Sequence, residues 1–194
     1  MSGARIEVDL TAFRHNVATL AELVSPARTM LAVKANAYGH GLVPLAQAAL
    51  EAGAHELAVL EVPAALTLRR AGITAPLFAW LHGATTDFAE AIEQDVDLGV
   101  SALWQLEAIA NSFRGKPARV HLKVDTGLHR NGARAEDWPG LVTAAVAAES
   151  AGHLTVAALW SHLADASPED DADALARFHE AVAVAASLGC TPPV

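Results

Sequence analysis

The sequence contains a single cysteine and no long apolar run, and both absences restrict what the protein can be. Cys190 is the only cysteine among 194 residues, so no disulfide can form within the chain. Although 53% of the residues are hydrophobic, no apolar stretch approaches the ~18–20 residues that span a bilayer. Residues 1–9 contain no apolar core of a signal peptide. These features predict a soluble, cytoplasmic protein.

Basic residues are also scarce. The chain has 13 Lys and Arg against 22 Asp and Glu, which gives a formal charge of −9. This acidity argues against nonspecific binding to nucleic acid. His121 and His129 flank Asp125, but this spacing is weak evidence for a metal, and we predict none. The chain also lacks the Gly-x-x-x-x-Gly-Lys pattern of a phosphate-binding loop.

Apolar periodicity predicts a chain of alternating strands and helices. At 194 residues the protein can form one domain with a substantial core. Short apolar runs alternate with longer segments rich in alanine and leucine, which predicts a parallel sheet with helices outside it. We expect strands at residues 29–33, 56–60, 75–80, 97–100, 120–124 and 154–160. We expect helices at residues 12–24, 42–52, 62–71, 88–94, 103–113, 141–151 and 171–188.

The number of strand–helix units leaves two architectures open. About six such units follow the first helix, whereas a closed (β/α)8 TIM-type barrel usually takes ~250 residues. The pattern therefore fits an incomplete barrel, and it fits equally well a smaller, complete doubly wound sheet. Residues 189–194 have the form Gly-x-x-Pro-Pro, which is typical of a connection into another strand.

The end of the first expected strand carries a lysine. Apolar residues 30–33 precede Lys34, and the segment that follows is rich in Asn and Gly. In barrel folds the C-terminal ends of the strands carry the catalytic groups. A partly desolvated lysine there is suited to forming a Schiff base with an aldehyde. Considered alone, Lys34 is interpreted equally well as a surface lysine.

A second segment combines lysine and arginine around the strand expected at residues 120–124. Strand alternation places Lys123 on the same face as His121 and Asp125, where an isolated ammonium is costly. Lys123 must therefore be paired, neutral or chemically modified. Arg130 lies on the following loop, where a guanidinium can bind a carboxylate or phosphate. The alternative is a surface Arg130 and a Lys123 paired with a neighbouring acid.

Two further residues complete the candidate set. His162 follows the strand expected at residues 154–160, on the same side of a parallel sheet as Lys34 and Arg130. A histidine in this position is more often structural than catalytic. Tyr38 is the only tyrosine, and both a ligand contact and an amphipathic position between a loop and a helix fit it.

These segments resemble the alanine racemase family. Residues 32–41 are similar to its pyridoxal-phosphate motif, which contains the cofactor lysine at the position of Lys34. Residues 123–132 match the family pattern Lys-x-Asp-Thr-Gly-x-x-Arg-x-Gly, and Ser161-His162 match its Ser/Thr-His at the end of a strand. The resemblance selects the barrel and implies an isomerase that interconverts L- and D-alanine and supplies D-alanine, a peptidoglycan precursor.

The resemblance also implies residue roles. Lys34 holds pyridoxal 5′-phosphate as an imine and acts as the base on one face of the substrate. Tyr38 reaches the cofactor phosphate, and Arg130 lies near the phenolic oxygen of the cofactor and near the substrate. Lys123 is carbamylated and orients Arg130, while His162 supports the cofactor ring.

The resemblance covers only the N-terminal part of such an enzyme. It implies that residues 1–194 are a truncated cofactor-binding barrel domain without the C-terminal β-domain. In the family that domain, from the partner subunit of a homodimer, donates the tyrosine that acts as the second base. We therefore expect this chain to be inactive alone. Two alternatives remain: a single-domain protein of pyridoxal-phosphate homeostasis that binds the cofactor without racemisation, and a non-catalytic truncated domain.

Overall fold

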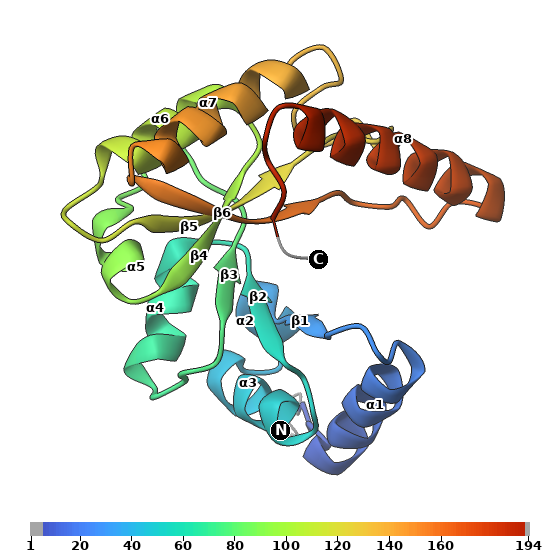
Figure 1. Cartoon of the computed structure of the whole chain (residues 1–194). Coiled ribbons are helices and arrows are strands. Elements are labelled where there is room, and N and C mark those ends of the chain that lie inside the picture. Colours follow the sequence, from blue (N-terminus) through green and yellow to red (C-terminus); the bar gives the residue numbers. More distant parts are fainter. Residues whose placement is uncertain (1–5, 193–194) are drawn as a thin grey trace. The chain divides into compact units, whose positions relative to one another are not determined.

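The computed structural model describes residues 6–192. The chain divides into two compact units, Met1–Ala79 and Trp80–Val194, and each contains three parallel strands in chain order with helices between them (Figure 1). The predicted alternation of strands and helices is confirmed. Parts of the segments predicted from residues 1–9 and 189–194 lie outside the described residues.

In the first unit, helix α1 precedes the strands and packs against α3 (Figure 1). The carboxylate of Asp9 caps α1 by accepting the backbone N–H groups of Thr11 and Ala12 at 2.8 and 3.0 Å. The elements are α1 (Leu10–Leu23), β1 (Met30–Ala32), α2 (Lys34–Tyr38), α3 (Leu42–Glu51), β2 (Glu56–Val59), α4 (Val62–Arg70) and β3 (Leu77–Ala79).

In the second unit, α6 and α7 lie side by side over the strands β4 to β6 (Figure 1). The buried indole of Trp138 joins α7 to α8, because its Nε1 donates to the carbonyl oxygen of Ala181 at 2.8 Å. The elements are α5 (Ala89–Glu93), β4 (Val96–Val100), α6 (Leu103–Asn111), β5 (Ala118–Lys123), α7 (Trp138–Ser150), β6 (Leu154–Trp160) and α8 (Pro168–Ser187).

The middle strands β3 and β4 are buried on both faces, as expected for parallel strands covered by helices, whereas β1 contains no buried residue. All three residues of β3 and all five of β4 are buried. Helices α7 and α8 begin earlier than predicted, and both have a proline in the first turn, where a missing N–H costs nothing. Ser167 caps α8 by accepting the N–H of Asp170 at 3.1 Å.

Candidate active site

Lys34 lies two residues past the end of β1, separated from it by Val33, so it stands at the strand's C-terminal end as the sequence predicts. The backbone then turns in the unusual left-handed sense: the φ angles of Ala35, Asn36, Ala37 and Tyr38 are 51°, 55°, 52° and 54°. Helix α2 is therefore a single left-handed turn. L-residues avoid this conformation because Cβ approaches the following carbonyl oxygen. No sequence pattern predicts this turn.

Local hydrogen bonds hold the left-handed turn. The N–H of Gly39 donates to the carbonyl oxygen of Ala35 at 2.9 Å, and the N–H of Gly41 donates to that of Asn36 at 2.9 Å. The side-chain oxygen of Asn36 also accepts the N–H of Leu42, the first residue of α3, at 2.8 Å. The turn thus connects the end of β1 rigidly to the start of α3.

The turn brings two of the candidate residues together. The Nζ atom of Lys34 lies 5.8 Å from the centroid of the Tyr38 ring. Tyr38 is 60% exposed, so its hydroxyl is accessible to a ligand. Both residues belong to the first unit.

The other three candidates, Lys123, Arg130 and His162, belong to the second unit. Lys123 ends β5 and is only 3% exposed, and its Nζ lies 4.5 Å from the centroid of the Trp160 ring. Burial and the charge of Arg130 lower the pKa of Lys123 to about 8, while the charge of Asp125 acts in the opposite direction. Lys123 is therefore a buried amine that loses its proton more readily than an ordinary lysine.

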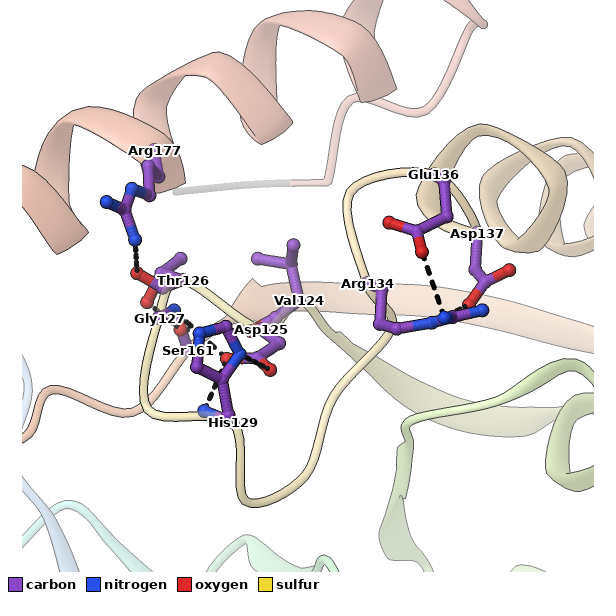
Figure 2. Close-up of polar contacts among 10 residues, drawn as sticks. All are labelled: Val124, Asp125, Thr126, Gly127, His129, Arg134, Glu136, Asp137, Ser161 and Arg177. Atoms are coloured by element: carbon purple, nitrogen blue, oxygen red, sulfur yellow. Dashed lines mark hydrogen bonds and ion pairs between the residues drawn. The ribbon is translucent and has the colours of Figure 1, made fainter.

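Arg130 is exposed on a compact loop, residues 125–132, which we call the Arg130 loop. Two backbone hydrogen bonds close its neck: Asp125 N–H donates to the carbonyl oxygen of Ala133, and Ala133 N–H donates to that of Lys123, both at 2.8 Å. Inside the loop, the Asp125 carboxylate accepts the N–H groups of Gly127 and His129 at 3.0 and 3.1 Å and lies 3.1 Å from Nδ1 of His129 (Figure 2).

The buried position of Asp125 acts to raise the pKa of its carboxyl. The N–H groups of Gly127 and His129 and the imidazole of His129 outweigh burial and hold this pKa below its usual range. The carboxylate is thus an internal cap that orders the loop while it is ionised.

Side chains from neighbouring segments fasten the Arg130 loop. The Thr126 hydroxyl lies 2.7 Å from that of Ser161, which follows β6, and Arg177 of α8 donates to the Thr126 carbonyl oxygen at 3.3 Å (Figure 2). On the other flank, the Ser101 hydroxyl, after β4, lies 2.6 Å from the side-chain oxygen of Asn131. The Arg130 loop is therefore held at Thr126 and Asn131 by the residues that follow β4 and β6 and by Arg177 of α8.

His162 lies two residues beyond β6, with its ring centroid 6.2 Å from that of Trp160. The Trp160 indole also contacts Lys123, so it is in contact with both His162 and Lys123. Sequence reasoning does not single out Trp160, and it includes Thr126 and Ser161 only as members of the matched motifs, without the contact between their hydroxyls.

A second charged group lies nearer the start of β5. Asp97 of β4 accepts from Nε of Arg119 at 2.9 Å and lies 2.9 Å from Nε2 of His121. Burial acts to raise the pKa of Asp97, but the hydrogen bonds and charges of His121 and Arg119 hold it below its usual range. The sequence predicts Asp97 only as the start of a strand, although its polar side chain in a buried run is a usable signal.

Three further properties concern the chemistry available. In residues 6–192, no group of three His, Cys, Asp or Glu side chains is arranged to hold a metal ion. Burial raises the pKa of the Cys190 thiol, which disfavours its nucleophilic thiolate. No helix in the described part of the chain is long and apolar enough to cross a membrane.

Comparison with known proteins supplies the family. Residues 8–194 match the family model described as alanine racemase, N-terminal domain. The alanine racemase of Beutenbergia cavernae is 50% identical over 172 residues, which cover 88% of this chain and 45% of that protein. The chain spans about half the length of the curated relatives it matches.

Solved structures agree. The alanine racemase from D-cycloserine-producing Streptomyces lavendulae matches with a TM-score of 0.91 and 41% identity over 95% of this chain and 50% of that one. The alanine racemase from Bacillus anthracis, solved with bound L-Ala-P, matches with a TM-score of 0.85 and 33% identity over 97% of this chain and 51% of that one.

These matches decide between the two architectures left open by the strand pattern. The α/β chain of parallel strands matches the N-terminal barrel domain of the racemases, and the predicted incomplete barrel is confirmed over the open doubly wound sheet. The family inferred from residues 32–41, 123–132 and 161–162 is confirmed as well. The chain belongs to the alanine racemase N-terminal domain family.

Proposed function

We propose that residues 1–194 are the cofactor-binding domain of a pyridoxal-phosphate-dependent alanine racemase. The observation that carries the proposal is Lys34, which stands at the C-terminal end of β1 in a chain of this family. Strand ends of this kind carry the catalytic groups of barrel enzymes. The L-Ala-P bound by the Bacillus anthracis relative supports an alanine-type substrate. In this proposal the protein is cytoplasmic and supplies D-alanine for peptidoglycan.

The side chains present suit pyridoxal 5′-phosphate. The Lys34 amine can react with an aldehyde, the exposed Tyr38 hydroxyl can donate to a phosphate, and the Arg130 guanidinium suits an anionic oxygen. When bound, the cofactor supplies an electron sink that makes the Cα–H bond of an amino acid acidic.

We assign two roles to the residues of the first unit: they bind the cofactor, and they transfer a proton of the substrate. Lys34 would hold the cofactor, and its Nζ could transfer the proton at the substrate Cα on one face. Tyr38 orients the phosphate. The left-handed turn fixes the backbone between Lys34 and Tyr38, so both side chains project from one short, ordered segment.

In the second unit, the proposed roles depend on the charges of Lys123 and Arg130. With a pKa of about 8, roughly a tenth of Lys123 is neutral at pH 7. Neutral Nζ can attack the carbon of carbon dioxide, form the N–C bond and release a proton, which leaves an anionic carbamate. We assign that carbamate to Lys123, where it attracts the Arg130 guanidinium. The Arg130 guanidinium would then be available to an anionic oxygen of the cofactor or substrate, and His162 would support the cofactor ring.

Inversion at Cα needs a base on each face. Tyr38 is the only tyrosine among the 194 residues and is assigned to the phosphate. The resemblance to alanine racemases implies that the second base is a tyrosine of the C-terminal domain of the partner subunit, and we assign it to such a group outside these residues. These 194 residues alone should bind the cofactor but form no D-alanine.

Reductive trapping tests the assignment of Lys34. The chain has three lysines, Lys34, Lys116 and Lys123, so borohydride reduction with pyridoxal 5′-phosphate followed by peptide mass spectrometry distinguishes every site. We expect a stoichiometric adduct on Lys34, no adduct in Lys34→Arg, and an unchanged adduct in the matched control Lys116→Arg. Equal labelling of Lys34 and Lys116, or no labelling, would refute the assignment. D-alanine formation by these residues alone would refute the assignment of the second base.

A further inference from the structure

Two hydroxyls connect the Arg130 loop to the end of β6, and their protons can be assigned. A serine hydroxyl has one proton, and that of Ser161 is donated to the carbonyl oxygen of Val124 at 2.9 Å. In the 2.7 Å contact between Thr126 and Ser161, Thr126 must therefore be the donor. The result is a directed chain from Thr126 through Ser161 to Val124 (Figure 2).

Thr126 is held at its backbone as well. Thr126 is only 1% exposed. Its carbonyl oxygen accepts a hydrogen bond from Nη1 of Arg177 at 3.3 Å. A Cβ atom at the next residue, Gly127, would lie 2.6 Å from the same Nη1 atom. Close approach of Arg177 thus requires glycine at position 127, and the guanidinium covers the start of the loop.

We propose that Thr126 is a positioning residue, which fixes the Arg130 loop against β6 and α8 and so sets the position of the Arg130 guanidinium. Thr126 lies between Lys123 and Arg130 in the chain, and Arg130 itself is exposed, so burial does not hold it in place. The cationic field of Arg130 at Lys123 depends on the loop conformation.

The consequence for Lys123 can be measured without cofactor. Arg130 is one of the causes that lower the pKa of Lys123. If the Thr126 hydroxyl is removed, the loop gains freedom, the mean separation of the two cations increases, and Lys123 holds its proton more strongly. The importance of this effect for catalysis rests on the proposed function; the effect on Lys123 does not.

The experiment is an NMR titration of the chain labelled with [ε-¹³C]lysine, in buffer free of carbon dioxide. Only three lysine signals are present, and Lys34→Arg and Lys116→Arg assign them. We expect Thr126→Val to raise the titration midpoint of Lys123 by about half a pH unit to one unit. Thr126→Ser, which keeps the hydroxyl, should restore the midpoint of the unsubstituted chain.

Three further variants make the result decisive. Thr143→Val changes an exposed threonine whose hydroxyl bonds only within α7, and it should leave Lys123 unchanged. Arg130→Ala should raise the midpoint at least as much as Thr126→Val. If Thr126→Val does not fold, Arg177→Gln removes the bond to the Thr126 carbonyl oxygen and should shift the midpoint in the same direction. An unchanged midpoint in a folded Thr126→Val or Arg177→Gln chain overturns the proposal, because the Ser101–Asn131 contact would then suffice to hold the loop.

Because the titration involves no cofactor, it remains informative if Lys34 takes no adduct. A raised midpoint without trapping at Lys34 would support the role of Thr126 and refute the proposed function. Trapping at Lys34 with an unchanged Lys123 midpoint would support the proposed function and refute the role of Thr126.

Discussion

The segments after β1 and after β5 both present a basic side chain, but they are held in different ways. After β1, four consecutive L-residues adopt left-handed angles and are fixed by hydrogen bonds within residues 33–42. After β5, the Arg130 loop is fixed by Ser101, Ser161 and Arg177, which come from distant parts of the chain. The first segment is locally determined and strained, while the second depends on tertiary contacts.

The difference has a physical consequence. Left-handed angles cost L-residues ~1–2 kcal/mol each, and that cost is present whatever the rest of the chain does. The Arg130 loop is ordered by side-chain hydrogen bonds, each of which can be removed singly. Perturbing the second unit should therefore loosen Arg130 and leave the geometry of Lys34 and Tyr38 unchanged.

The largest expected effect is at the neck of the Arg130 loop. Gly132 has a φ of +129°, and a Cβ atom there would lie 2.7 Å from the backbone N of Asp125 and 2.8 Å from the carbonyl carbon of Val124. Since backbone cannot move aside cheaply, Gly132→Ala should lower the free energy of unfolding by about 3–5 kcal/mol. Urea denaturation measures this.

Gly140 provides the matched control for that substitution. It lies in α7, and a Cβ atom added there would meet no atom within 4 Å. Gly140→Ala should therefore raise the free energy of unfolding by about 0.5–1 kcal/mol. A Gly132→Ala chain as stable as the unsubstituted one would show that the loop neck is not constrained.

Charge at Lys123 gives the next largest effect. Its pKa falls from an ordinary 10.5 to about 8 in the folded chain. Between these values the unfolded chain binds more protons, so stability rises with pH. Below pH 8, where Lys123 is protonated in both states, the folded chain bears the full cost of burying the charged ammonium. Lys123→Met removes this penalty, so its stability advantage over the unsubstituted chain should shrink by up to about 3 kcal/mol between pH 8 and 10.5.

Urea unfolding at several pH values, without carbon dioxide, measures that difference. Lys116→Met, at the exposed partner of Asp95, is the matched control for the loss of one ammonium. If the advantage of Lys123→Met does not change with pH, burial does not lower the pKa of Lys123.

A smaller effect is expected for Ser161→Ala. The substitution leaves the Thr126 hydroxyl and the Val124 carbonyl oxygen without this partner, and a buried group left unsatisfied costs about 1–3 kcal/mol. Hydrogen exchange should accelerate at the amides of the Arg130 loop and stay unchanged at Gly39. Ser187→Ala, which removes an exposed hydroxyl in α8, is the control. Faster exchange at Gly39 would contradict the independence of the two segments.

The sequence predicted the strand ends but not what surrounds them. Lys34 and His162 could be placed because apolar runs end just before them, and Asp9 could be assigned as a cap from local chemistry alone. The contact of Lys123 with Trp160 could not. Val120 pairs with Val156, but an irregularity after Val120 shifts the register so that Lys123 pairs with Trp160. Without that shift its partner would be Leu159, and nothing in the local sequence marks the shift.

The left-handed turn was unpredictable for the opposite reason. Local preference alone predicts right-handed or extended angles for Ala35 and Ala37. The observed angles are imposed by a set of hydrogen bonds that end on Asn36, Gly39 and Gly41. Propensity is a property of single residues, whereas this turn depends on several bonds forming together.

The smallest predicted effect tests that strain directly. Ala35 is exposed and has a φ of 51°, so Ala35→Gly relieves a left-handed L-residue without loss of packing. Relief of ~1–2 kcal/mol is opposed by the greater freedom of glycine in the unfolded chain, about 0.5–1 kcal/mol, which leaves a net gain. Ala18→Gly, at an exposed position inside the right-handed α1, should instead lose about 1 kcal/mol. The same substitution in the same unit should thus change stability with opposite signs. Equal losses in urea denaturation would mean that the turn after Lys34 carries no strain, and that both segments depend on their contacts alone.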